Sequence, residues 1–419
     1  MQPGSARITG WGHYAPETVL TNADLEQLVE TSDEWIVSRT GIRERRVAGP
    51  GESTATLGAV AGNRALAVAG LEPDQVDMIL VATATPDYQL PSTAALVKEA
   101  MGATRAAAMD VGAVCSGFVY ALTAGHAYVA SGMYRNVVVI GAEVLTRYMD
   151  YTDRNTCVLF GDGAGAVVLS ASEEPGGGLL GFELTADPDG AYNIWLPAGG
   201  SRNPPRRSTL DRRGHYLRMD GRETYRYATR TLASSARTAL ERAGIHSDDI
   251  ALFIPHQANI RIIESVAKQL GISMDRVYVN VDRYGNTSAA SVPIALAEAV
   301  DEGRVQPGDR IVFVAFGSGY TSGAAVVEWT ADPANGRRAD GVPPVVSIHQ
   351  PADWTPDDAT PPELRAILSA RHRATAPVAA TNVPNVTRAP GGTASGVHGA
   401  RDPRSAPVAA VATGTRPTP

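Results

Sequence analysis

Short apolar runs alternate with longer, periodically apolar stretches along this chain as far as residue 329. The short runs predict buried strands at residues 6–12, 76–83, 106–111, 136–142 and 160–169. The longer stretches predict helices at residues 21–30, 52–70, 91–101 and 116–131. The first part of the chain is therefore expected to form an α/β unit.

The same order of elements recurs in the second part of the chain. Helices are predicted at residues 222–243, 259–270 and 288–301, and strands at 250–255, 277–281, 310–316 and 323–329. We therefore predict a duplicated α/β fold with two halves, residues 1–173 and 174–330, and with helices covering buried sheets. When the halves are overlaid, the turn that holds Cys115 corresponds to the turn that holds Asn286.

Residues 331–419 have a different composition, rich in Pro, Ala, Thr, Gly and Arg. Such a segment buries too little apolar surface to order itself, so we predict a disordered tail. Residues 362–371 are the exception, because their pattern allows a short amphipathic helix. Whether that helix docks or stays solvated is left open by the pattern.

Composition narrows the function classes. The chain is 44% hydrophobic and 19% charged with a net charge of −7, which suits a soluble globular enzyme and argues against a general nucleic-acid binder. Two cysteines in 419 residues fit a reducing compartment rather than a disulfide framework. We find no signal-like apolar start and no run long enough to span a membrane, so we expect a cytoplasmic protein without membrane contact.

Cys115 lies at a predicted strand-to-helix turn, directly before the helix at residues 116–131. Backbone amides and the positive end of the helix dipole stabilise an anion at such a position. We therefore expect a thiol with a lowered pKa that acts as a nucleophile. The alternative is a buried cysteine that only fills the core.

Two polar side chains are predicted at the same edge of the fold as Cys115. His256 directly follows the apolar run at residues 250–255, and Asn286 follows the run at 277–281. Ligands in layered α/β folds gather at the carboxyl ends of strands. Separately, each residue also suits a purely structural role. Together with Cys115 they form a nucleophile and two hydrogen-bonding groups, the set that acyl transfer needs.

A basic run with one tryptophan occupies residues 32–46. It is either a solvated face or a site where the aromatic ring stacks on a base while arginines pair with phosphate.

Four motifs in this chain resemble those of the β-ketoacyl-[acyl-carrier-protein] synthase III family. They are residues 32–43 (SDEWIVSRTGIR), 110–118 (DVGAVCSGF), 256–259 (HQAN) and 284–291 (YGNTSAAS). The resemblance runs from about residue 6 to Trp329, and the tail is not part of the usual family chain. It implies a thiolase-like fold in a layered α-β-α-β-α arrangement.

The resemblance also implies a reaction, the decarboxylative condensation of a short acyl-CoA primer with malonyl-[acyl carrier protein] at the start of fatty acid or related polyketide synthesis. Cys115 would carry the acyl group, and His256 and Asn286 would stabilise the malonyl-derived enolate. The backbone amides of Cys115 and Ser318 would form the oxyanion hole. Family members have glycine where Ser318 stands, which puts the shape of the pocket there in question. No metal or redox cofactor is implied.

Substrate and partner contacts follow from the same resemblance. CoA would be bound by Trp35, Arg39, Arg154, Tyr225 and Asn259. The acidic carrier protein would meet a basic patch of Arg226, Arg261 and Lys268. The family is dimeric, and Leu90 would reach the acyl pocket of the partner subunit in a homodimer.

Other readings of the motifs remain. A thiolase would need a second catalytic cysteine towards the C-terminus, and an elongating synthase a second histidine where Asn286 stands. A type III polyketide synthase shares the Cys-His-Asn set but lacks the carrier-protein-type motifs. Within the family, a relative from secondary metabolism that forms an ester or amide is the alternative. From another class, the alternative is a catalytically silent scaffold.

Overall fold

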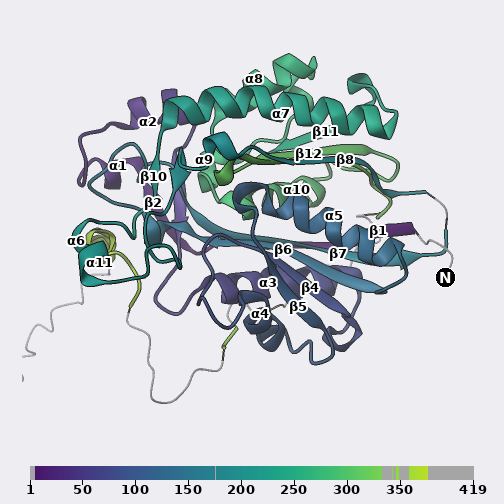
Figure 1. The fold of residues 1–419 in the computed structure, drawn as a ribbon, viewed down its shortest axis with the longest axis horizontal. Helices are drawn as coiled ribbons and strands as arrows, with labels where there is room; N and C mark the ends of the chain where they lie inside the picture. The colour runs from purple at the N-terminus through teal and green to yellow at the C-terminus, as the bar shows by residue number, and fades with distance from the viewer. Residues whose placement is uncertain (1–4, 175, 333–341, 343–345, 349–357, 376–419) are drawn as a thin grey trace, which may run out of the picture. The chain divides into compact units, whose positions relative to one another are not determined.

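Two mixed sheets with helices between and around them form the body of the protein (Figure 1). The structure, a computed structural model, describes residues 5–174, 176–332, 342, 346–348 and 358–375. The five-stranded sheet has the order β1-β7-β6-β4-β5, with bounds β1 (Ser5–Tyr14), β4 (Met78–Ala82), β5 (Ala107–Val111), β6 (Asn136–Val144) and β7 (Asp162–Ser172). The four-stranded sheet has the order β11-β12-β13-β8, with bounds β8 (Gly178–Ala186), β11 (Leu252–Pro255), β12 (Arg310–Phe316) and β13 (Thr321–Glu328).

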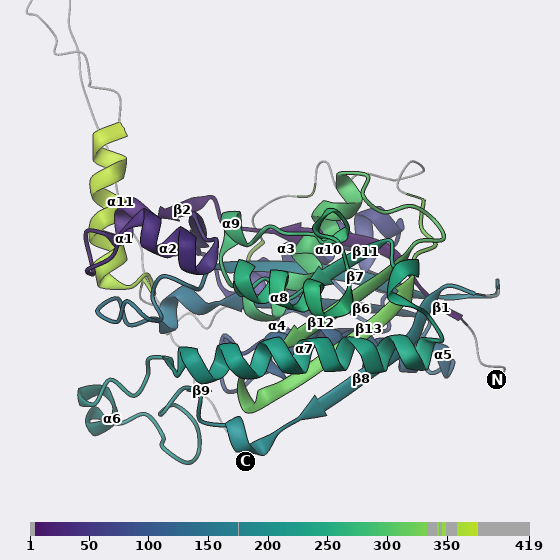
Figure 2. The same ribbon diagram turned by 90° about the horizontal axis from the view of Figure 1, so that it is seen from above.

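Helices form three layers around these sheets. The central helices α5 (Gly117–Ala130) and α10 (Ser291–Asp301) lie between the sheets, and almost all of α10 is buried. α3 (Thr54–Ala69) and α4 (Thr93–Met101) cover the outer face of the five-stranded sheet. α7 (Gly221–Ala243) and α8 (Ile260–Leu270) cover the other sheet (Figures 1 and 2). The predicted thiolase-like α-β-α-β-α arrangement is confirmed.

The two sheets repeat one pairing pattern, which supports the predicted duplication. β4 and β6 are parallel, and β6-β7-β1 continues antiparallel. In the other sheet β11 and β12 are parallel, and β12-β13-β8 continues antiparallel. α5 and α10 take equivalent central places, and each follows a short 3₁₀ turn. The turns that hold Cys115 and Asn286 therefore face each other across the centre.

Two predicted strands differ from the structure. The run at 106–111 was expected to be buried, but β5 pairs only with β4, and Ala107 and Met109 on it are exposed. Small apolar residues occur both in buried strands and in edge strands that another surface covers, so this sequence pattern does not distinguish the two. The strand expected at 277–281 is reduced to a single bridge between Phe253 and Val277. A short helix, α9 (Val281–Tyr284), begins there instead.

Several smaller elements lie outside the two sheets and the helices that cover them. The helix predicted at 21–30 ends early, because only four residues are helical before a series of turns. The basic run at 32–46 forms a helix and a strand, and the exposed, arginine-rich residues 199–213 contain one short helix. These elements are β2 (Thr18–Thr21), α1 (Asn22–Leu25), α2 (Asp33–Thr40), β3 (Glu44–Val47), β9 (Ile194–Trp195), α6 (Arg207–Asp211) and β10 (Arg218–Met219).

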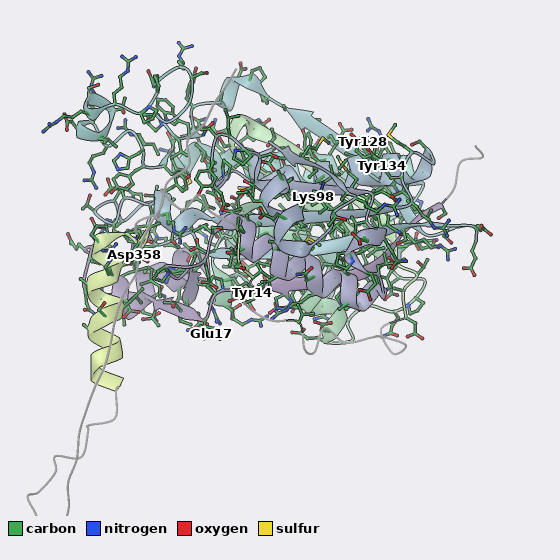
Figure 3. All side chains as sticks on the ribbon, turned by 90° about the horizontal axis from the view of Figure 1, so that it is seen from below. Tyr14, Glu17, Lys98, Tyr128, Tyr134 and Asp358 are labelled. Atoms are coloured by element: carbon green, nitrogen blue, oxygen red, sulfur yellow. The ribbon has the colours of Figure 1, made fainter. Side chains whose placement is uncertain are left out.

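The predicted amphipathic helix in the tail exists as α11 (Pro362–Thr375). Leu364 is fully buried in the cluster that contains Leu25 and Tyr151, and Leu368 packs against the same cluster. Asp358, beside the first turn of α11 (Figure 3), forms an ion pair with Arg365 at 3.0 Å. The helix that the pattern allowed at residues 362–371 is therefore present, and it docks through Leu364 and Leu368 instead of staying solvated.

Val346 and Ile348 also pack against the body, on the cluster under α3 and α4. Most of the other residues for which we expected disorder lie outside the described part of the chain. All strands of the five-stranded sheet come from residues 5–172, and those of the four-stranded sheet from 178–328. Because the chain up to Arg371 forms one compact unit, the boundaries at 173 and 330 stay a prediction. Among the described helices, none has the length and apolarity needed to cross a bilayer.

Candidate active site

Cys115 lies in a strained turn at the start of α5. The residue before it, Val114, has φ 48°, a left-handed conformation that is costly for a β-branched side chain. The turn is held from both sides, because the Ser116 hydroxyl donates to the Ala113 carbonyl at 2.8 Å and the Thr321 hydroxyl donates to the same carbonyl at 3.0 Å. The surrounding structure thus fixes the position of the thiol.

The turn after β12 packs directly against Cys115. A side-chain carbon at Gly317 would come within 2.7 Å of the Cys115 backbone nitrogen, so only glycine fits. The next residue, Ser318, lines the same cavity as Cys115, and its hydroxyl donates to the Ile194 carbonyl. The Ser318 hydroxyl therefore binds the backbone of β9. Cys115 and Ser318, whose backbone amides are the predicted oxyanion donors, both line this cavity.

The electrostatic surroundings of Cys115 contradict our expectation of a lowered pKa. Burial raises the pKa of the thiol to about 12, and a nearby Ser288 hydroxyl lowers it only in part. In the free protein the thiol is therefore protonated at neutral pH, and its proton must leave as the sulfur attacks. Cys157, the second cysteine, is also free and buried.

His256 directly follows β11, and its backbone amide donates to the Val314 carbonyl of β12 at 2.8 Å. The neighbouring Gln257 fixes this loop, because its side chain donates to the Tyr278 carbonyl and accepts from the Asn280 amide. Burial lowers the pKa of His256 to about 4. The imidazole is therefore neutral at pH 7, with one nitrogen as donor and the other as acceptor.

Asn286 is held by its backbone against the strand region of the first half. Its amide donates to the Leu159 carbonyl at 2.8 Å, and its carbonyl accepts from Gly161 at 3.1 Å. The side-chain Oδ1 accepts from the Ser288 amide at 2.8 Å. This bond orients the carboxamide so that its Nδ2 group remains as the donor.

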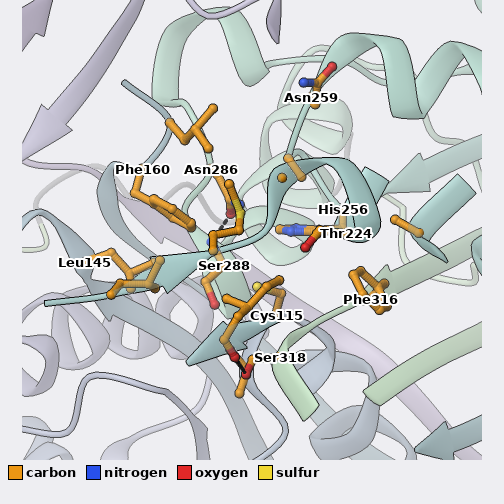
Figure 4. A pocket seen from close by; sticks show the side chains of 18 of the residues that line it. Cys115, Leu145, Phe160, Thr224, His256, Asn259, Asn286, Ser288, Phe316 and Ser318 are labelled. Carbon is orange, nitrogen blue, oxygen red and sulfur yellow. Dashed lines mark hydrogen bonds between the residues drawn. The ribbon is translucent and has the colours of Figure 1, made fainter. Parts of the chain in front are cut away.

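These three side chains line one cavity of about 520 Å³ (Figure 4). The predicted convergence of Cys115, His256 and Asn286 is therefore correct, although they come from three distant loops. Other predicted residues on its wall are Arg39, Tyr225, Asn259 and Ser318. The wall also has Leu145, Phe160 and Phe316, which make it largely apolar around the thiol.

A second hollow of about 550 Å³ continues the cavity towards the surface. The two share Thr40, Asn155 and Trp195, and Trp35 lines the outer one. The guanidinium groups of Arg39 and Arg154 lie over the Trp35 ring at 5.6 and 5.3 Å. Trp35 of the basic run therefore lies beside two guanidinium groups at this hollow, and its role in binding a nucleotide stays a prediction.

The expected carrier-protein residues lie outside the cavity. Arg226 on α7 is exposed and forms an ion pair with Glu223 at 3.2 Å. Arg261 at the start of α8 lies over the Tyr225 ring at 5.8 Å, and Lys268 is exposed near the end of the same helix. Leu90 is 88% exposed and takes no part in the cavity of its own chain.

Several residues at the site escaped the sequence reasoning. Ser288 lines the cavity with a left-handed φ of 48°, matching that of Val114, and Ser291 contacts His256. Both stood in a motif that we quoted, but no spacing rule pairs them with distant residues. Arg218 and Arg222 line the outer hollow. Arg218 lies on β10 and Arg222 in the first turn of α7, and no motif in the sequence linked either residue to the site.

Comparisons with known proteins agree with this geometry. Residues 109–188 match the family model described as 3-Oxoacyl-[acyl-carrier-protein (ACP)] synthase III, and residues 240–329 match the model of its C-terminal part. The chain is 54% identical over 326 residues to the "Beta-ketoacyl-[acyl-carrier-protein] synthase III" of Roseiflexus castenholzii, covering 78% of this chain and 98% of that one.

Solved structures give the same result. The crystal structure of 3-oxoacyl-[acyl-carrier-protein] synthase III from Aquifex aeolicus VF5 is similar, with a TM-score of 0.72 and 44% identity over 77% of this chain and 100% of that chain. The priming β-ketosynthase of the R1128 polyketide biosynthetic pathway has a TM-score of 0.74 and 34% identity, over 79% and 98% of the two chains.

Proposed function

This chain belongs to the β-ketoacyl-[acyl-carrier-protein] synthase III family, and we propose that Cys115, His256 and Asn286 divide its reaction between them. The enzyme is an acyltransferase that starts fatty acid synthesis by condensing an acyl-CoA primer with malonyl-[acyl carrier protein]. The observation that carries the division of roles is the single apolar cavity lined by a thiol, a neutral imidazole and an oriented carboxamide.

In the first half-reaction the Cys115 sulfur attacks the thioester carbonyl of acyl-CoA as its proton leaves. The tetrahedral oxyanion accepts hydrogen bonds from the amides of Cys115 and Ser318, the bond from the carbonyl carbon to the CoA sulfur breaks, and the CoA thiolate takes up a proton, which balances the one lost by the Cys115 thiol. The acyl group then remains on the sulfur as a thioester. The close approach of Gly317 to Cys115 supports this arrangement, because it brings the second turn beside the nucleophile.

In the second half-reaction malonyl on the carrier protein loses carbon dioxide. The electron pair of the broken bond forms an enolate, whose oxygen accepts from His256 Nε2 and Asn286 Nδ2. The enolate carbon attacks the acyl-cysteine, a carbon–carbon bond forms, and the thioester bond to Cys115 breaks, so that the sulfur leaves with the electron pair and takes up a proton. Two neutral donors suit this anion, since burial keeps His256 uncharged. These steps use only the chain and its two substrates, so the proposal needs no metal or redox cofactor.

CoA binding is proposed along the outer hollow. Adenine stacks at Trp35, Arg39 and Arg154 bind the nucleotide phosphates, and the pantetheine arm passes Tyr225 and Asn259. The hollow that runs inward from Trp35 supports this route. The carrier protein then docks over α7 and α8, on a patch of Arg226, Arg261 and Lys268.

We further propose a cytoplasmic homodimer. β5 is an edge strand with exposed apolar residues, and such edges are usually covered. The exposed Leu90 lies on the loop that follows β4, the neighbour of β5. A second subunit on this edge would cover both features and bring Leu90 towards the partner's acyl pocket.

The two half-reactions allow a direct test of the roles. Cys115→Ala should abolish primer loading, whereas His256→Ala and Asn286→Ala should load normally and lose decarboxylation of malonyl-[acyl carrier protein]. Loading is measured by intact mass with acetyl-CoA and decarboxylation by released carbon dioxide. Decarboxylation within about 2-fold of wild type in either of the last two variants would reject the enolate role of that residue.

A further inference from the structure

The inner ring nitrogen of His256 has a buried partner that the reaction scheme has not used. His256 Nδ1 lies 2.6 Å from the hydroxyl oxygen of Ser291, the first residue of α10. Ser291 is 2% exposed and His256 4% exposed, so water does not compete for this bond. The distance is that of a strong hydrogen bond.

A second contact fixes the direction of this bond. The Gln257 backbone amide donates to the same Ser291 oxygen at 3.4 Å. If the Nδ1 proton also pointed at this oxygen, the serine would accept twice, and its own proton would have no acceptor among the hydrogen bonds of the described residues. When the hydroxyl donates to Nδ1 instead, every polar group of the cluster is satisfied. The proton of the neutral ring is then on Nε2.

We propose that Ser291 is a positioning residue that fixes His256 as the Nε2–H tautomer and so makes it a hydrogen-bond donor to the enolate oxygen. The inference rests on the proposed role of His256 and adds what makes that role possible. A neutral histidine with its proton on Nδ1 would present a lone pair to the enolate and repel it. The serine therefore decides whether the ring stabilises or opposes the developing charge.

The position of Ser291 explains how the fold supplies this contact. Its oxygen comes from the start of a central helix, five residues after Asn286. The Asn286 turn and the Ser291 hydroxyl thus belong to one rigid unit, packed between the sheets. One segment thereby carries Asn286, one of the two donors to the enolate, and fixes the tautomer of His256, the other donor.

Kinetics of Ser291→Ala and Ser291→Thr test the proposal in the full chain. Ser291→Ala should lower the rate of malonyl decarboxylation about 10-fold, while acetyl loading on Cys115 stays within about 2-fold of wild type. Ser291→Thr, which keeps the hydroxyl, should restore most of the rate. An unchanged decarboxylation rate in Ser291→Ala would overturn the proposal. So would an equal loss of both half-reactions in a folded variant.

The tautomer can also be read without kinetics. In protein labelled with ¹⁵N-histidine, two-bond ¹⁵N–¹H correlations should show His256 protonated on Nε2, with the signals assigned through His256→Gln. A proton on Nδ1 in the wild-type protein would refute the proposal even if no serine variant folds. If His256→Ala spares decarboxylation, the proposed function itself fails. If only Ser291→Ala spares it, the inference about Ser291 fails alone.

Discussion

Replacing His256 by glutamine should reveal the protonation state on which the proposed chemistry depends. Burial lowers the pKa of His256 from 6.5 to about 4 in the folded protein. The unfolded chain therefore binds a proton at this residue between pH 6.5 and 4, where the folded protein does not. Proton binding to the unfolded chain therefore leaves the free energy of unfolding unchanged well above pH 6.5 and lowers it as the pH falls towards 4.

The size of this effect follows from the pKa difference. At about 1.36 kcal/mol per pKa unit, the whole loss amounts to about 3 kcal/mol, of which about 2 kcal/mol has occurred at pH 5 and almost none at pH 7.5. Glutamine at position 256 does not titrate. The stability difference between variant and wild type should thus shift by about 2 kcal/mol in favour of the variant between these pH values.

Urea unfolding of both proteins at pH 7.5 and pH 5.0 measures this double difference. In this double difference, the loss of contacts such as the bond to Ser291 cancels if its effect is independent of pH. The other histidines titrate in both proteins, so their contributions cancel as well. A shift below about 0.5 kcal/mol would refute the reasoning. It would mean that the folded protein accepts a proton at His256 near pH 6, and that the ring is not held neutral by burial.

Three further predictions concern the nucleophile, the oxyanion turn and the tail helix. In a Cys157→Ser background, alkylation of Cys115 by iodoacetamide should rise about tenfold per pH unit from pH 6 to 9; a plateau near pH 7 would contradict the raised pKa of the thiol. Gly317→Ala should reduce acyl loading at least 100-fold because its methyl group meets the Cys115 amide, whereas Gly200→Ala, with open space around it, should load normally. Equal loading by the two glycine variants would exclude that contact. Leu364→Ala should lower the free energy of unfolding by about 2–5 kcal/mol in a urea titration; a loss below about 0.5 kcal/mol would mean that α11 does not dock.

Much of the fold could be predicted because its elements carry strong local signals. The apolar runs that became β4, β6 and β12, and the periodic stretches that became α3, α7 and α10, specify element type by their own sequence. The duplication was visible as a repeated order of elements. The structure adds that even the parallel and antiparallel pairings repeat.

The misassigned elements depended on neighbours that a local pattern does not contain. β5 has the composition of a buried strand, but its burial is decided by what lies beyond the sheet edge. Residues 277–281 have strand-like side chains, yet only Val277 pairs. The chain then turns into α9, and Asn286 follows this helix. The pattern at residues 362–371 allowed a helix but did not show whether it docks, because the surface that buries Leu364 comes from other parts of the chain.

The residues of the site could be predicted where a sequence motif contained them. Cys115, His256 and Asn286 stood at strand ends, where layered α/β folds collect polar groups. The pKa of the thiol was predicted in the wrong direction, because a helix N-terminus can be read from sequence but the burial of the thiol cannot. Ser291 was overlooked for a related reason, since its contact with His256 joins residues 35 positions apart.

The claim on which the rest depends is that Cys115 carries the acyl group. Mass spectrometry of the full chain after mixing with acetyl-CoA, followed by peptide mapping, tests it most directly. We predict one acetyl group per chain, on the peptide that contains Cys115, and none in Cys115→Ala. No adduct on the wild-type chain, or the same adduct on Cys115→Ala, would contradict the account.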